Sequence, residues 1–118
     1  MQYLAAHKKL IGVAILALSA FAMAPLASAE DATVVKLTLK NHKFQPAETH
    51  VPANKPVTIE LNNQDTTPAE FESKTLRVEK IVAGGATATI QVRALAAGRY
   101  RFFDDYHQDT TEGVLIVE

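Results

Sequence analysis

The chain has 118 residues, with 12 Lys or Arg, 13 Asp or Glu and no cysteine. This length predicts one domain, and the missing cysteines exclude disulfides and thiolate ligands. Both methionines, Met1 and Met23, lie near the N-terminus, so the chain beyond residue 29 carries no sulfur. Any metal bound there must be held by oxygen and imidazole nitrogen.

The first 29 residues have the pattern of a secretory signal peptide. A basic stretch at 7–9 precedes an apolar run at 10–21, which is too short to span a membrane. Small residues at 27 and 29 then form a cleavage signal. We therefore expect cleavage after Ala29, a mature domain at 30–118, a periplasmic location and no membrane insertion of the mature protein.

The mature part holds ten basic and thirteen acidic residues, a formal charge of −3. This balance gives no basic surface of the kind that binds nucleic acid or anionic lipid. The remaining 89 residues are enough to bury a modest core without cross-links.

Polar and apolar residues alternate along most of the mature chain, with Gly, Pro and Asn between the alternating segments. Such short strands with regular turn signals predict an all-β, two-sheet Greek-key sandwich of about seven strands. The expected strands include residues 33–40, 57–62, 76–79, 87–92, 99–102 and 114–117. The expected core residues are Val35, Leu37, Val57, Ile59, Leu61, Leu76, Val78, Ile90, Val92, Tyr100, Phe102 and Ile116.

Two polar segments, at 67–73 and 104–109, are interpreted as loops. If residues 70–72 are extended, Glu70 and Glu72 share one face and Phe71 takes the other. The mature chain has one serine, Ser73, without the context of a catalytic nucleophile, and no phosphate-binding loop. The sequence therefore does not predict an enzyme.

The order of these segments resembles that of a cupredoxin. The resemblance rests on Phe44-Gln45-Pro46, Pro52–Val57, Asn62-Asn63, Gly84-Gly85, Gly98–Phe102 and Gly113–Val117. The segments Glu70–Glu72 and Phe102–His107 resemble more narrowly the EfeO-type cupredoxin-like domains, periplasmic proteins associated with bacterial iron permease systems.

The resemblance also implies which ligands of a blue-copper site are missing. Glu70 stands at the place of the first histidine, and Asp104 at that of the cysteine. His107 matches the second histidine, while Thr111 or Glu112 replaces the axial methionine. A trigonal site of two histidines and a cysteine cannot form, so blue-copper electron transfer is excluded.

In its place the resemblance implies a site made of Glu70, Asp104 and His107. Weaker candidates are Glu72, Asp105, Glu112 and His42. Carboxylate and imidazole ligands suit Cu(II) or iron. The alternative is that these acidic segments are merely hydrated surface.

The expected function is that of a periplasmic metal-binding accessory protein, using Cu(II) or iron. By resemblance, it works in iron acquisition with a membrane iron permease or another periplasmic iron-uptake component. Any part in iron oxidation would belong to a multi-component system. The alternative is a metal-free cupredoxin-fold module that docks to a periplasmic or membrane partner. The oligomeric state is not predicted.

Overall fold

The computed structural model describes residues 32–118, so the predicted signal peptide and its cleavage site lie outside the described residues. The described residues form nine strands and one short 3-10 turn, η1 (Asp105–His107). The strands are β1 (Thr33–Lys40), β2 (Lys43–Gln45), β3 (Glu48–Val51), β4 (Val57–Asn63), β5 (Ala69–Ser73), β6 (Val78–Val82), β7 (Thr87–Val92), β8 (Gly98–Asp104) and β9 (Glu112–Val117).

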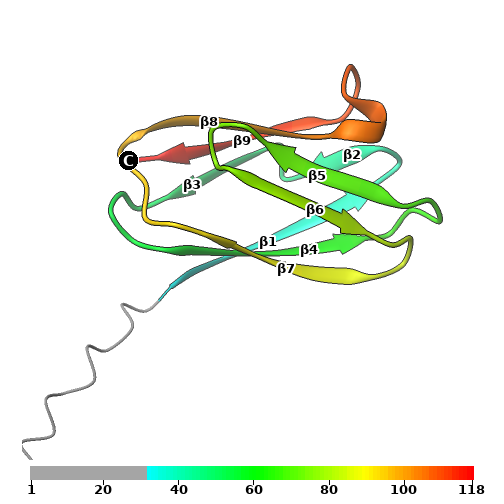
Figure 1. Ribbon diagram of the computed structural model, residues 1–118, viewed down its shortest axis with the longest axis horizontal. Helices are drawn as coiled ribbons and strands as arrows, with labels where there is room; N and C mark the ends of the chain where they lie inside the picture. Colours follow the sequence, from blue (N-terminus) through cyan, green and yellow to red (C-terminus); the bar gives the residue numbers. More distant parts are fainter. Residues whose placement is uncertain (1–31) are drawn as a thin grey trace, which may run out of the picture.

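The strands make two stacked sheets, which confirms the predicted all-β sandwich (Figure 1). One sheet has the order β2-β1-β4-β7 and the other β3-β9-β8-β5-β6. Both sheets are mixed, because β1 runs parallel to β4 and β3 runs parallel to β9. Between residues 32 and 118 there is no helix long and apolar enough to cross a membrane.

The structure has more strands than the seven or so that were predicted. Two short strands, β2 and β3, lie on either side of Pro46. The interpretation of 67–73 as a loop was wrong for all but its first two residues, because Ala69–Ser73 is strand β5. In this strand only Ala69, Phe71 and Ser73 point inward, and the two outward residues are acidic. An alternation this short does not distinguish a strand from a polar loop.

Nine of the twelve predicted core residues are buried, and Val78 and Tyr100 pack against the core partly buried. The prediction that Ile116 belongs to the core was wrong. Leu115 and Val117 point inward, and Ile116 lies on the outer face. The run 114–117 is apolar at every position, so no polar residue marks which face is outside. Leu76 is buried, but it lies in the turn before β6 rather than on a strand.

An aromatic cluster fills the core at one end of the sandwich. The rings of Phe71 and Phe102 stack at 5.0 Å, and Phe44 meets Phe102 edge-on at 5.0 Å. Gly113 lies against this cluster, where an added Cβ would come within 2.4 Å of the Phe102 ring. Phe44 follows His42 by two residues and Phe71 is paired with Asp104, so the cluster supports the candidate site.

Candidate metal centre

Two segments far apart in sequence meet at one end of the sandwich. The β1–β2 hairpin carries His42, while the end of β8 and η1 carry Asp104 and His107. Figure 1 shows this hairpin and the orange η1 turn at the same end, with the C-terminus at the other. The side chains of His42, Asp104 and His107 each offer a ligand atom, and these atoms lie within 4.8 Å of one another.

Asp104 is the buried member of this group, which we call the histidine group. Its side chain is 1% exposed. Oδ1 accepts hydrogen bonds from the backbone N–H groups of Glu70 (3.0 Å) and Tyr106 (3.1 Å). Oδ2 accepts from Nδ1 of His107 at 3.1 Å. A buried carboxylate is costly unless it is paired, so Asp104 favours a positive charge beside it.

The two imidazoles of the histidine group lie against each other. The ring centroids of His42 and His107 are 4.2 Å apart, with an interplanar angle of 41°. When Nδ1 of His107 donates to Asp104, the neutral ring keeps its lone pair on Nε2. A carboxylate that fixes the tautomer of a histidine in this way is the usual partner of metal-binding histidines.

A second group, the carboxylate group, lies beside the first on the outer face of β5. It consists of Glu70, Glu72 and Asp105, whose ligand atoms also come within 4.8 Å of one another. The extended backbone places Glu70 and Glu72 on one face and buries Phe71 on the other, as predicted for an extended segment.

Hydrogen bonding, burial and neighbouring charges raise the pKa values of side chains in and around the carboxylate group. A hydrogen bond to the carboxyl of Glu79, together with burial and repulsion from neighbouring carboxylates, raises the pKa of Glu70 from 4.5 to about 7. Burial and the charges of Asp105 and Glu79 also raise the pKa of Glu72. Burial, with nearby Glu70, raises the pKa of the Tyr106 hydroxyl. This face of β5 therefore attracts cations.

The structure divides the expected trio between the two groups. It brings Asp104 and His107 together, with His42, a weaker candidate, as their third neighbour. Glu70 touches Asp104 only through its backbone N–H, and its carboxylate belongs with Glu72 and Asp105. The assignment of ligands stays a prediction, and the structure defines two donor sets that can be tested separately.

Glu112 belongs to neither group. Its carboxylate accepts a hydrogen bond from Nε of Arg101 at 2.7 Å, in an exposed ion pair. Sequence reasoning did not find Glu79 on β6, whose carboxyl group lies beside the carboxylate group. Pairing of Glu79 with Glu72 across two antiparallel strands could have indicated it, had β5 been recognised as a strand.

The donors present fit some metals and not others. The histidine group offers two imidazoles and a carboxylate, which suits Cu(II), Zn(II) or iron. The chain has no cysteine, so these donors do not fit a blue-copper centre.

Comparison with known proteins agrees with the fold. A family model described as a cupredoxin-like domain matches residues 12–117. An uncharacterized protein of Rickettsia prowazekii is 42% identical over 83 residues, which cover 70% of this chain. The chain spans 66% of the length of that relative.

Two solved structures illustrate the structural likeness. Auracyanin A, a blue copper protein of Chloroflexus aurantiacus, has a TM-score of 0.63 at 16% identity, covering 73% of this chain and 98% of its own. The metal-binding domain of the Cu(I)-exporting ATPase CopA of Streptococcus pneumoniae D39 has a TM-score of 0.61 at 14% identity, covering 72% and 84%. At these identities the likeness concerns the fold.

Proposed function

This chain belongs to the cupredoxin-like domain family, and from that premise we propose that it is an exported accessory protein that binds Cu(II) or iron. The buried carboxylate of Asp104, hydrogen-bonded to His107 and adjacent to His42, is the observation that carries the proposal. Without a cation, this negative charge has only His107 and two backbone N–H groups to stabilise it.

Each residue of the histidine group has a distinct part in the proposal. His42 and His107 donate lone pairs, and Asp104 supplies negative charge while it fixes the tautomer of His107. A bound Cu(II) would supply Lewis acidity and a one-electron redox couple, with hard ligands that favour the oxidised ion. The carboxylate group beside it attracts cations toward this end of the molecule.

We further propose that the protein acts in the periplasm, with an iron permease or another iron-uptake component. Two features support this step: the signal-peptide pattern of residues 1–29 and the resemblance of Glu70–Glu72 and Phe102–His107 to EfeO-type domains. Sequencing the N-terminus of protein from a periplasmic fraction tests the location, with Glu30 as the expected first residue. Co-purification of the permease with the tagged protein tests the partner.

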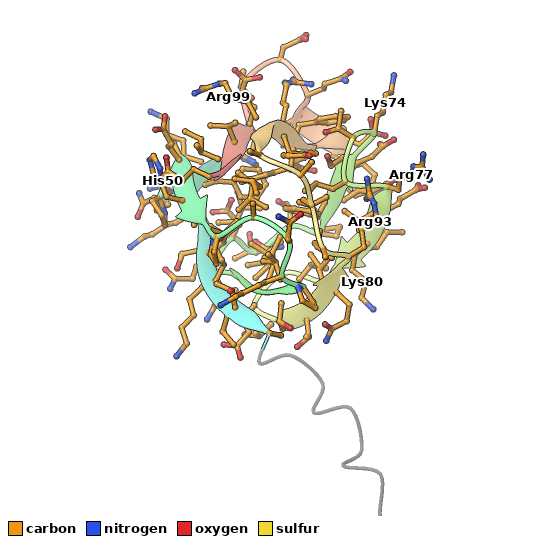
Figure 2. The ribbon with its side chains drawn as sticks, turned by 90° about the vertical axis from the view of Figure 1, so that its left-hand side faces the viewer. His50, Lys74, Arg77, Lys80, Arg93 and Arg99 are labelled. Carbon is orange, nitrogen blue, oxygen red and sulfur yellow. The ribbon has the colours of Figure 1, made fainter. Side chains whose placement is uncertain are left out.

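Cu(II) titration of the purified protein tests metal binding. We expect a complex without intense blue colour, since no thiolate is present, and Cu(II) affinity above that for Mn(II) or Fe(II). His107→Ala should remove most of the Cu(II) affinity. His50→Ala is the matched control, because His50 lies at the opposite end (Figure 2).

A separate variant tests the carboxylate group as the metal site. Glu70→Gln should leave Cu(II) affinity nearly unchanged if the histidine group binds the metal. Should His107→Ala bind Cu(II) as tightly as the parent while Glu70→Gln does not, the carboxylate group is the site. If the parent binds no metal, the proposal fails and the metal-free docking module is favoured.

A further inference from the structure

His42 lies in a two-residue hairpin turn that contacts from other parts of the chain hold in place. Asn41 and His42 both have positive φ angles, 52° and 58°, at the turn between β1 and β2. Two positive φ angles in a two-residue loop fit a type I′ turn, the favoured connection in such hairpins, and Asn suits its first position. Glycine is the usual residue at the second position, which His42 occupies here. Two residues elsewhere in the chain, Asp65 and Thr111, form hydrogen bonds to this turn.

Asp65 holds the N–H side of the turn. Its Oδ1 accepts from the backbone N–H of Asn41 at 2.6 Å, and its Oδ2 accepts from that of His42 at 2.9 Å. The same Oδ2 lies 3.8 Å from Nδ1 of the His42 ring. The hydrogen bonds from the His42 and Asn41 backbone are the leading reasons why the pKa of Asp65 is lowered.

Asp65 is itself fixed to the sandwich. Its N–H donates to Oδ1 of Asn63, which is completely buried, and its C=O accepts from the N–H of Gly85. The Asn63 amide in turn donates to the backbone C=O groups of Thr67 and Val82. The turn that carries His42 is therefore attached to a buried, hydrogen-bonded residue at the end of β4.

Thr111 connects all three members of the histidine group through their backbones. Its hydroxyl donates to the C=O of His42 at 2.6 Å. Its N–H donates to the C=O of His107, and its C=O accepts from the N–H of Asp104, both at 3.0 Å. Thr111 is completely buried, so these bonds are shielded from competing water.

We infer that Asp65 and Thr111 are positioning residues that hold His42 beside His107 and Asp104, so that the donors are assembled before a metal arrives. The expected effect on metal affinity rests on the proposed function, but the positioning of His42 can be tested without metal. Neither residue needs to touch the metal. Pre-assembly lowers the cost of ordering ligands on binding and so favours affinity.

The variants distinguish the loss of a hydrogen bond from a change in side-chain size. Thr111→Val keeps the shape but removes the hydroxyl, and Thr111→Ser restores the hydroxyl. Asp65→Ala removes both acceptors, whereas Asp65→Asn keeps one acceptor oxygen without the charge. Thr58→Val is the control, because it removes an exposed threonine hydroxyl that bonds Gln91 on β7.

The first measurement is made without metal, by proton NMR of the full protein. We expect a nuclear Overhauser effect between the His42 and His107 rings in the parent, Thr58→Val and Thr111→Ser proteins. It should weaken or vanish in Thr111→Val and Asp65→Ala, while the core resonances stay dispersed. If Thr111→Val does not fold, Asp65→Ala alone decides the outcome.

The second measurement is the electron paramagnetic resonance spectrum and affinity of added Cu(II). Removal of either positioning residue should change the spectrum and weaken Cu(II) binding about 10–100-fold. Thr111→Ser should restore both. Rings that stay together in Asp65→Ala and in any folded Thr111→Val would overturn the inference. Failure of the parent to bind Cu(II) would instead overturn the proposed function. The nuclear Overhauser effect between His42 and His107 would then be the test of the positioning role.

Discussion

The two ends of the sandwich each carry a histidine bonded to carboxylate, in different surroundings. At one end, His50 contacts Glu118 at 2.8 Å and Glu48 at 3.1 Å, and all three side chains are at least half exposed. Figure 2 looks onto this end, where His50 and Arg99 are labelled among several cationic side chains. At the other end, His107 contacts a single carboxylate that is buried.

The difference shows that the number of histidine–carboxylate contacts does not define a candidate site. Water can replace either partner of an exposed pair, so the His50 pairs contribute little to stability or specificity. At the candidate site, burial removes that option for Asp104, and a second imidazole lies 4.2 Å from the first. The following predictions test this contrast, from the largest effect to the smallest.

Phe71→Ala should produce the largest loss of stability. Phe71 is completely buried, stacks on Phe102 and supports the strand pair that carries Asp104. Removal of such a core ring costs about 3–5 kcal/mol in the free energy of unfolding, measured with urea by circular dichroism. Ile116→Ala is the control on the outer face and should cost less. Equal losses would mean that the core under the candidate site is loosely packed.

Asp104→Asn should weaken Cu(II) binding about 10–100-fold, the usual effect of losing a partner that orients a metal-binding histidine. The amide oxygen can still accept from Glu70 and Tyr106, so the turn is retained while the charge is lost. Glu118→Gln is the matched change at the exposed end and should leave Cu(II) affinity unaltered. Equal Cu(II) affinity in both variants would remove the distinction between the two ends.

The sequence predicted the sandwich because most strands alternate clearly between apolar and polar residues, as in 57–62 and 87–92. The resemblance to cupredoxins placed Asp104 and His107 together, because they match the places of the cysteine and the second histidine. The sequence could not decide for His42, whose position depends on a left-handed turn held by Asp65, 23 residues away. The same resemblance grouped the Glu70 carboxylate with Asp104, because Glu70 stands at the place of the first histidine. The face on which β5 displays this carboxylate depends on sheet register, which the sequence does not show.

The carboxylate group predicts a pH dependence of stability. The folded state raises the pKa of Glu70 from 4.5 to about 7, mainly through Glu79, so the folded protein binds this proton more tightly than the unfolded chain. The resulting contribution to stability is present at low pH and is lost as pH rises from about 4.5 to about 7. Glu79→Gln should reduce this loss and shift the Glu70 titration, followed by carbon NMR, to lower pH. An unchanged titration would show that Glu79 is not the main cause.

The titration of His50 should have the smallest effect on stability. Its two carboxylate partners, Glu118 and Glu48, determine the direction of that effect. The hydrogen bond from His50 to Glu118 is the main reason why its pKa is raised above 6.5, with Glu48 adding to the shift. A histidine with a raised pKa contributes stability that is complete below about 6.5 and disappears as pH rises through the folded-state value. Glu118→Gln should therefore move the His50 midpoint, measured by proton NMR, toward 6.5. High salt should reproduce part of that shift in the parent, because these exposed charges are screened. If neither the variant nor salt moves the midpoint, contacts other than these exposed pairs set the His50 pKa, and the contrast between the two ends loses its electrostatic basis.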